Sequence, residues 1–317
     1  MLRRRCLLVL IASGLVAGAC AAHSPEPWAT TRGQAHPLTG RIWDVHAQRF
    51  VDERTLVARL GSADFVLLGE KHDNPDHHRL QARVVNALIA AGRRPSIAFE
   101  MLGADDEPAI ARYLGDAPAD AAGLGAAVQW ERSGWPDWEL YQPIADAAVR
   151  AHVPVVAADL SGPMLTGLRR QGASALDRAF VARYALDRPA PPEMRAAMVA
   201  ELDAAHCGTA PAAALERMTL TQRARDAWMA DRLADQGQAV LIAGSGHVRL
   251  DRGVPMYVAR RAPGARLASV AFVEVAEEAT RPGQYGERFG APRPPFDYVW
   301  FTPRVDDEDA CARFRAR

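Results

Sequence analysis

The stretch VLLGEKHDNPDHHRLQ, residues 66–81, joins an apolar run to a dense cluster of histidines and acids. A short apolar run that ends at a glycine is typical of a buried strand. After this run, Asn74 is a suitable N-cap and Pro75 suits the first position of a helix. The stretch therefore predicts a strand followed directly by a helix, with Glu70 and His72 at the carboxyl end of the strand.

The rest of the chain repeats this alternation of short apolar runs with longer helical patterns, which is the signature of βαβ units. We therefore predict an α/β fold with a mainly parallel sheet flanked by helices. Residues 161–236 have no strand signal and are rich in Ala, Leu, Met and Arg, so we expect a helical insertion that forms a smaller subdomain. The predicted strands are DFVLLGE, SIAFEML, VPVVAADL, AVLIAGSGHV, LASVAFVEV and DYVWFTP.

The N-terminus has the pattern of a targeting segment. Residues 1–19 contain a basic start and an apolar run that is short for a membrane span, which indicates a signal peptide. The following AGAC resembles the lipobox of bacterial lipoproteins, which would place a lipid on Cys20; the alternative is simple secretion. We expect a tether over residues 20–40, a folded domain over residues 41–317, and a lipid-anchored protein of the cell envelope, at the outer membrane and facing the periplasm or the surface.

Composition narrows the function classes. The 38 basic and 38 acidic side chains balance, so the chain lacks the general basic charge by which proteins bind nucleic acid. Lys71 is the only lysine in the sequence. After removal of the signal peptide, Cys207 and Cys311 remain, and the sequence leaves open whether they form a disulfide.

Ionisable residues stand at four predicted strand ends: Glu70 with His72, Glu100, Asp159, and His247. Ligands of open parallel sheets collect at the carboxyl ends of the strands. Two of these ends share the pattern G-x-x-H, in which glycine allows a sharp exit and a close approach to a ligand. We expect a metal-binding or proton-transferring site there. The alternative is a buried network of carboxylates and histidines that ties the loops together.

Several segments, in order along residues 41–305, resemble the ChaN-like family of bacterial lipoproteins. They are VLLGEKHDNPDHHRLQ, IAFEML, WPDWELYQPIADAA, QRARDAWMADRL and LIAGSGHVRLDRGVP. The family is described as haem-binding and linked to iron uptake, within a superfamily that includes Tiki metalloproteases, TraB proteins and erythromycin esterases. The resemblance implies an α/β domain with a helical part and a haem (iron protoporphyrin) ligand, which two subunits of a homodimer could share.

Haem requires an axial ligand, apolar walls and cations for its propionates. Tyr141 is the first candidate axial ligand and Tyr113 the second. Arg225 interrupts an apolar helical stripe, so it is expected to pair with a propionate, an active-site carboxylate or a neighbouring acid. The remaining candidates for haem binding are His77 and His206, as ligands, and Trp138, as an apolar wall. Each of them also has a structural alternative, as a core residue or at a helix end.

Two functions follow, with a ligand-free interaction domain as a third and less favoured reading. The first is a membrane-anchored, non-enzymatic haem-binding lipoprotein in haem or iron acquisition, working with a haem receptor or transporter. The second is a metal-dependent hydrolase, an esterase or protease. In that case Glu70, His72, Glu100 and His247 bind a divalent ion or activate water, and one of the carboxylates acts as general base.

Overall fold

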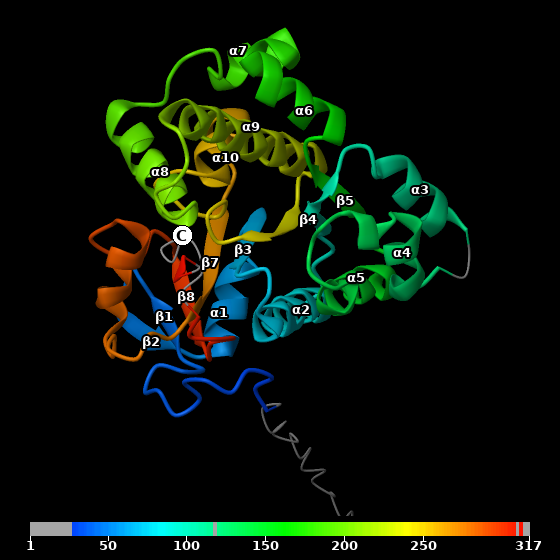
Figure 1. The fold of residues 1–317 in the computed structure, drawn as a ribbon. Helices are drawn as coiled ribbons and strands as arrows, with labels where there is room; N and C mark the ends of the chain where they lie inside the picture. The colour runs from blue at the N-terminus through cyan, green and yellow to red at the C-terminus, as the bar shows by residue number, and fades with distance from the viewer. Residues whose placement is uncertain (1–26, 117–118, 309–310, 313–317) are drawn as a thin grey trace, which may run out of the picture.

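The computed structural model describes residues 27–116, 119–308 and 311–312 (Figure 1). The predicted signal peptide and Cys20 lie outside these residues. Within them, eight strands form one sheet in the order β2-β1-β8-β7-β3-β6-β4-β5. The strands are β1 (Ile42–Asp44), β2 (Arg49–Val51), β3 (Phe65–Glu70), β4 (Ser96–Gly103), β5 (Val155–Asp159), β6 (Ala239–Gly244), β7 (Leu267–Glu274) and β8 (Tyr298–Thr302).

The sheet is parallel from β8 to β5, as the alternating pattern predicts, and all six predicted strands are present. The short β1 and β2 were not among the predicted strands, and they add an antiparallel edge beside β8. All residues of β3 are buried because helices cover both faces of the sheet. Val66 and Leu68 enter the core on one face, and Phe65 and Leu67 enter the core on the other.

The face that carries Val66 and Leu68 is covered by five described α-helices from the first half of the chain. They are α1 (Glu53–Leu60), α2 (Pro75–Ala90), α3 (Glu107–Gly115), α4 (Ala121–Ala127) and α5 (Trp138–Ala151), with the short η1 (Trp130–Arg132) before α5. Helix α2 begins as predicted, because the Asn74 side chain accepts hydrogen bonds from the backbone N–H groups of Asp76 and His77. The strand-to-helix connection of residues 66–81 is thereby confirmed.

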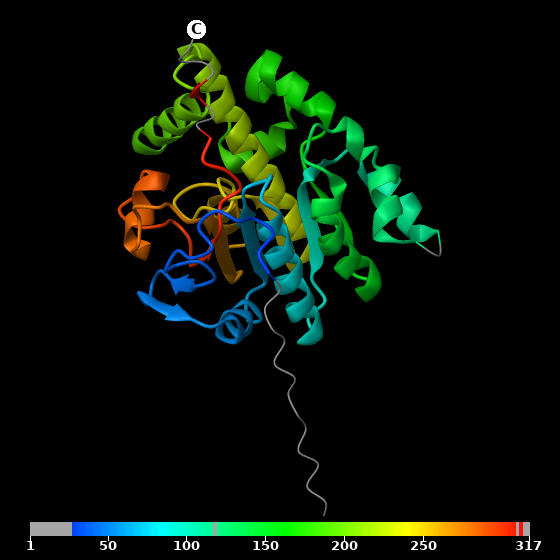
Figure 2. The same ribbon diagram turned by 60° about the horizontal axis from the view of Figure 1, so that its bottom comes forward.

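The predicted insertion, residues 161–236, is described in full and contains helices and connecting loops, and no strand. It comprises α6 (Gly162–Gln171), η2 (Gly172–Ala175), α7 (Arg178–Tyr184), α8 (Pro192–Ala205) and α9 (Ala212–Gln236). Helix α9 runs past the second face of the sheet with α8 beside its first half (Figure 2). Helix α10 (Val254–Arg261) packs beside α9, and η3 (Pro282–Phe289) is part of the chain segment that connects β7 to β8. The insertion thus covers the carboxyl ends of β4 and β5, and most of its buried apolar residues belong to the hydrophobic core on the second face of the sheet.

Residues 27–40 differ from the expected flexible tether. The carboxylate of Asp76 accepts hydrogen bonds from the backbone N–H groups of Ala29 and Thr30 and from the Thr30 hydroxyl. Leu38 is buried in the core, and the backbone of Arg32 forms an isolated antiparallel β-bridge with that of Arg304. The folded domain therefore begins before residue 41. None of the described helices is both long and apolar enough to cross a membrane.

Candidate functional site

A histidine and a carboxylate meet at the end of β3. Nδ1 of His72 lies 2.6 Å from Oε1 of Glu70, whose side chain is fully buried. Burial lowers the pKa of His72, but its hydrogen bond and charge interaction with Glu70 outweigh this and leave the pKa raised. The ring is one third exposed and packs against Trp135 with centroids 4.8 Å apart. A Cβ at Gly244 would lie only 3.0 Å from Nε2 of His72, so glycine gives the ring room at this strand end.

A second histidine, His247, follows β6 and lies between Glu100 on β4 and Asp226 on α9. Nε2 of His247 is 3.1 Å from Glu100, and Nδ1 is 2.6 Å from Asp226 on α9. Burial disfavours the imidazolium, but the charges of Glu100 and Asp226 raise the pKa of His247 to about 10. Burial also raises the pKa of Glu100, yet His247 and Arg225 reverse this and hold it well below its usual range. His247 is therefore a charged group inside the protein at neutral pH.

Arg225 on α9 connects the carboxylates of two strands. Its guanidinium donates to Asp159 from Nε and Nη2, and Nη2 also donates to Glu100 at 2.9 Å. Burial lowers the pKa of Arg225, but the charges of Glu100 and Asp159 outweigh this effect and leave the pKa raised. Of the partners predicted for Arg225, the structure shows the site carboxylates.

The predicted metal site is not supported. Among the described residues, no group of three or more His, Cys, Asp or Glu side chains is placed to hold a metal ion. Arg225 and the protonated His247 instead supply the positive charge that balances Glu100 and Asp159. Glu70 and His72 form a separate pair. The predicted ligands Glu70, His72 and His247 therefore belong to two groups, the Glu70–His72 pair and the ion pairs of His247 with Glu100 and Asp226.

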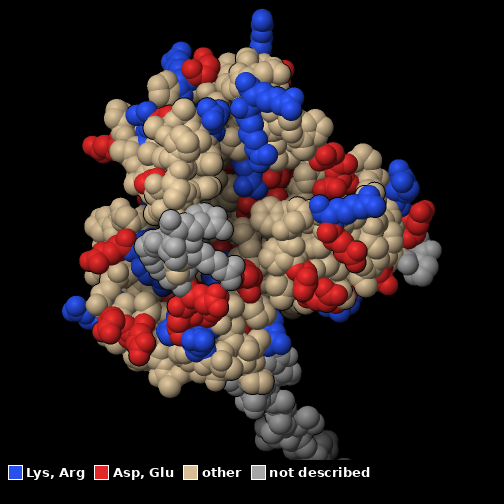
Figure 3. Space-filling model, viewed as in Figure 1, with Lys and Arg blue, Asp and Glu red and all other residues tan. Residues whose placement is uncertain are grey.

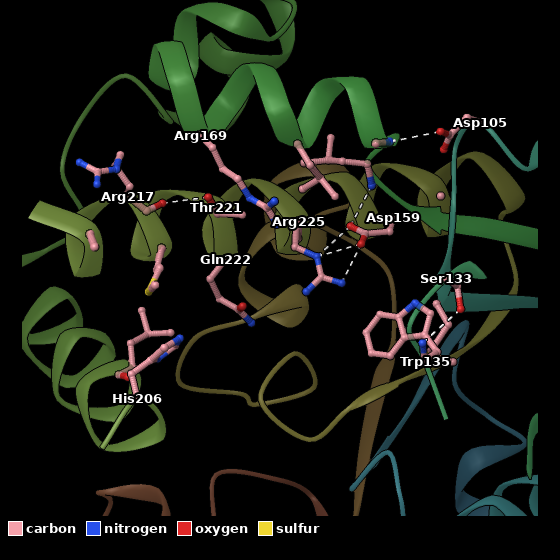
Figure 4. A pocket seen from close by; sticks show the side chains of 18 residues that line it. Asp105, Ser133, Trp135, Asp159, Arg169, His206, Arg217, Thr221, Gln222 and Arg225 are labelled. Atoms are coloured by element: carbon pink, nitrogen blue, oxygen red, sulfur yellow. Dashed lines mark hydrogen bonds and ion pairs between the residues drawn. The ribbon is translucent and has the colours of Figure 1, made fainter. Parts of the chain in front are cut away.

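A cavity of about 810 Å³ lies between the insertion and the ends of β4 and β5 (Figure 4). Side chains of α6, α8 and α9 form one side, and Ser133 and Trp135 stand opposite. Arg225 and Asp159 line the cavity, which connects it with the charged network. Its apolar walls come from Met101, Trp135, Leu160, Leu165, Leu202 and Met218.

Two further arginines line the cavity, Arg169 from α6 and Arg217 from α9. Within the described residues, neither guanidinium has a hydrogen-bond or ion-pair partner, and both residues are exposed. Basic side chains gather above the hollow between the insertion and the strand ends, and acidic side chains appear at its floor (Figure 3). The cavity therefore offers two positive charges to a ligand with negative groups.

His206 caps the end of α8 and lines the same cavity. Its Nδ1 lies 2.7 Å from the carbonyl oxygen of Leu202. Because a carbonyl only accepts, the proton of the neutral ring is on Nδ1 and the lone pair is on Nε2. This is the tautomer that a metal-binding histidine adopts when a backbone carbonyl orients it. The next residue, Cys207, forms a disulfide with Cys311, which answers the question that the sequence left open.

Tyr141 and Trp138 do not reach the cavity. Tyr141 is fully buried, packs against His78 and Trp130, and its hydroxyl has no partner among the described residues. Burial raises its pKa, which opposes a tyrosinate ligand. Trp138 is buried, and its ring N–H donates to the carbonyl of Ala121. Both aromatic residues belong to the core and lie outside the cavity lining, so neither contacts a ligand bound in the cavity.

His77 and Tyr113 also lie outside the cavity. Both ring nitrogens of His77 are in use, with Nδ1 accepting from the backbone N–H of Lys71 and Nε2 next to the hydroxyl of Thr302. Burial holds the pKa of His77 well below its usual value. The Lys71 side chain is partly exposed and pairs with Asp73. The hydroxyl of Tyr113 bonds to Asp120 at 3.0 Å. Neither residue is available to a ligand in the cavity.

The site contains residues that were not predicted. Asp226 orients His247, and Gln222 lies 3.1 Å from the same ring. The apolar stripe of this helix is interrupted at both Gln222 and Arg225, but the sequence-based prediction gives a role only to Arg225. Arg169 and Arg217 have no such signal, because exposed arginines are common on helices.

A family model described as "Haem-binding uptake, Tiki superfamily, ChaN" matches residues 56–258. The structure of the cofacial haem-binding ChaN of Campylobacter jejuni is similar, with 21% identity, a TM-score of 0.61, and coverage of 82% of this chain and 95% of that one. No curated protein matches the chain.

Two more distant structures are also similar in part. The type III effector HopBA1 shares 16% identity at a TM-score of 0.45, covering 78% of this chain and 92% of that one. A mutant of the erythromycin esterase EreC, in its open conformation, shares 14% identity at a TM-score of 0.39, covering 79% of this chain and 78% of that one. Because the family model spans most of the chain, the protein belongs to the family of haem-binding uptake proteins of the Tiki superfamily, ChaN.

Proposed function

We propose that the protein binds haem in the cavity beneath the helical insertion, with Nε2 of His206 as an iron ligand. The observation that carries the proposal is the combination of His206, two unpartnered arginines and apolar walls around one cavity of the described residues. Haem supplies an iron that accepts axial ligands and two propionates that carry negative charge. Membership of the ChaN family supports the same ligand.

The residues present fit the group. A cavity of about 810 Å³ is within the usual size of small-molecule sites. Arg169 and Arg217 would hold the propionates, since guanidinium pairs well with carboxylates. The thioether of Met218 lies in the same wall and is a sulfur donor of the kind that haem proteins use. Arg225 is already engaged by Asp159 and is expected to stay with the charged network.

The cellular role in the proposal is haem or iron acquisition at the cell envelope, without enzymatic activity. A lipid on Cys20 would anchor the chain at a membrane surface, at the outer membrane and facing the periplasm or the surface. A haem receptor or transporter would deliver or receive the haem, and a homodimer could share it. The N-terminal sequence supports the anchor, and the family supports the ligand.

The test is a haem titration of residues 21–317 followed by absorbance. Wild-type protein should bind saturably with a spectrum of histidine ligation. His206→Ala should change that spectrum and weaken binding, and Arg169→Ala with Arg217→Ala should weaken binding without changing it. His46→Ala and Arg54→Ala are matched controls on exposed residues outside the cavity lining. The same spectrum and affinity in His206→Ala would remove His206 as the ligand, and no saturable binding by wild type would refute the proposal.

One observation favours a second candidate, hydrolysis without a bound metal. The ring of His72 is partly exposed while buried Glu70 holds its Nδ1, which is the arrangement of an oriented general base. Above its raised pKa, neutral His72 would accept a proton from water as the water attacks an ester or amide carbonyl. Turnover of an ester and peptide panel should then rise with pH and disappear in His72→Ala and Glu70→Gln. No turnover by wild type across the panel would eliminate this candidate.

A further inference from the structure

Helix α8 carries two of the cavity's lining residues at its C-terminal end, Leu202 and His206, yet it is weakly embedded. Met198 is its only fully buried residue, and it packs mainly on α9. Few buried contacts mean that such a helix moves easily unless other bonds hold it. The position of His206 therefore depends on what fastens the helix.

The first fastening is a pair of buried cations. Glu201 on α8 accepts from Arg252 and lies 3.5 Å from Arg249, which are 8% and 1% exposed in their side chains. Both arginines come from the segment between β6 and α10. Arg249 also bonds to Asp251 and to the carbonyl of Phe289, whereas Arg252 has Glu201 as its only ion-pair partner among the described residues. The body of α8 is thus tied to the sheet side of the molecule.

The second fastening is the disulfide between Cys207 and Cys311. It joins residues 104 apart in sequence, with 5.4 Å between their Cα atoms, and it directly follows His206. Cys207 has a φ of +59°, in the left-handed region that non-glycine residues rarely adopt. Gly208 follows with a φ of +68°, and its N–H donates to the carbonyl of Asp203. The backbone beside His206 is therefore in an uncommon conformation that surrounding bonds must maintain.

We propose that the Cys207–Cys311 disulfide positions His206 in the cavity wall and makes haem binding redox-sensitive. This inference rests on the proposed function. A dithiol reductant would donate two electrons and two protons, so that the S–S bond breaks, two S–H bonds form, and the reductant becomes a disulfide. Once the bond is broken, Cys207 is free to leave the left-handed region, and the turn that carries His206 loosens. Glu201 keeps the body of α8 in place, so the change is local.

The experiment compares haem titrations of residues 21–317 in oxidised and reduced states. Reduction uses a phosphine that is removed without oxygen, and alkylation with mass spectrometry counts the free thiols. The double variant Cys207→Ser with Cys311→Ser represents the open state without thiols. We expect at least a tenfold weaker affinity and loss of the histidine spectrum in the reduced and serine proteins, with recovery after reoxidation of the wild type. In the His206→Ala background, reduction should have no further effect.

A haem-free readout separates this inference from the proposed function. Amide hydrogen exchange of residues 202–208 should be faster in the reduced and serine proteins, whereas exchange in α9 should stay the same. If oxidised wild type does not bind haem, the proposed function fails, and the exchange data alone decide whether the disulfide positions the turn. Equal affinity in both redox states, or tighter binding through a thiolate in the reduced wild type alone, would overturn the redox inference while haem binding stands.

Discussion

Arg225 donates to both carboxylate oxygens of Asp159, from Nε at 2.9 Å and from Nη2 at 2.7 Å. This bond joins α9 of the insertion to the end of β5, directly at the cavity. The same guanidinium also donates to Glu100, so one side chain of α9 binds carboxylates from two strands. The insertion is therefore attached to the sheet by electrostatics at the point where the candidate site lies.

Removing this cation should destabilise the fold. Arg225→Ala leaves Glu100 and Asp159 as buried charges with fewer partners, which costs about 3–5 kcal/mol for a broken buried pair. Urea denaturation measures the loss. Arg217→Ala, on the same helix but without a partner among the described residues, is the control and should change stability by less than about 0.5 kcal/mol. Similar values for the two variants would show that the Arg225 pairs contribute little.

Stability should depend on pH through His247. Its pKa rises from 6.5 to about 10 on folding, so its contribution is complete below the unfolded value and is lost as pH rises from 6.5 through 10. Glu100 acts in the opposite direction, because its lowered pKa gives stability that is present above 4.5 and is lost in acid. The urea midpoint of unfolding should therefore decrease toward both acid and alkaline pH. His247→Gln should reduce the decrease at alkaline pH. An equal alkaline loss in that variant would contradict the assignment.

Tyr141 offers a direct test between the two candidate axial ligands, Tyr141 and His206. Its buried hydroxyl has no partner among the described residues, so Tyr141→Phe should leave stability unchanged or raise it by about 1 kcal/mol. Haem titration of this variant should match wild type. Tyr184→Phe is the matched control, since its hydroxyl bonds to Asp231 at 2.5 Å and its loss should cost about 1–3 kcal/mol. A changed haem spectrum in Tyr141→Phe would restore Tyr141 as a ligand.

The cap of α2 should be unusually costly to remove. Asn74 is fully buried, caps the helix, and donates to Glu274 and to the carbonyl of Pro303. Asn74→Ala should cost about 2–4 kcal/mol, because a cap and a buried polar contact are lost together. Asp52→Ala removes the exposed cap of α1 and should cost about 1 kcal/mol. Thermal denaturation compares the two, and equal losses would mean that burial adds nothing.

The sequence predicts those parts of the fold that local patterns determine. The run ending at Glu70 and the cap at Asn74 each carry their own signal, so β3 and the start of α2 follow from them. Because parallel strands end at one edge, Glu70, Glu100 and His247 could also be placed together without coordinates. Strands β1 and β2 escaped detection because three residues are too few to show an alternating pattern.

Other features depend on how segments pack and leave no local trace. Tyr141 lies three residues after Trp138, and this spacing fits a ligand-binding face and a core face equally well. The structure decides for the core. Arg169 and Arg217 line the same cavity only because α6 and α9 both border it, and this arrangement of the two helices is set by tertiary packing.

Lys71 has a practical consequence as the only lysine of the chain, placed between Glu70 and His72. Burial lowers its pKa, but Asp73 and Glu274 raise it overall, so amine-reactive dyes should couple to it only under alkaline conditions. Its side chain is 43% exposed, which leaves room for such a dye. One side-chain fluorophore would then stand beside the candidate site in every molecule. Because bound haem would quench the dye's fluorescence by energy transfer, the unmodified sequence already contains an attachment point for an optical sensor of its proposed ligand.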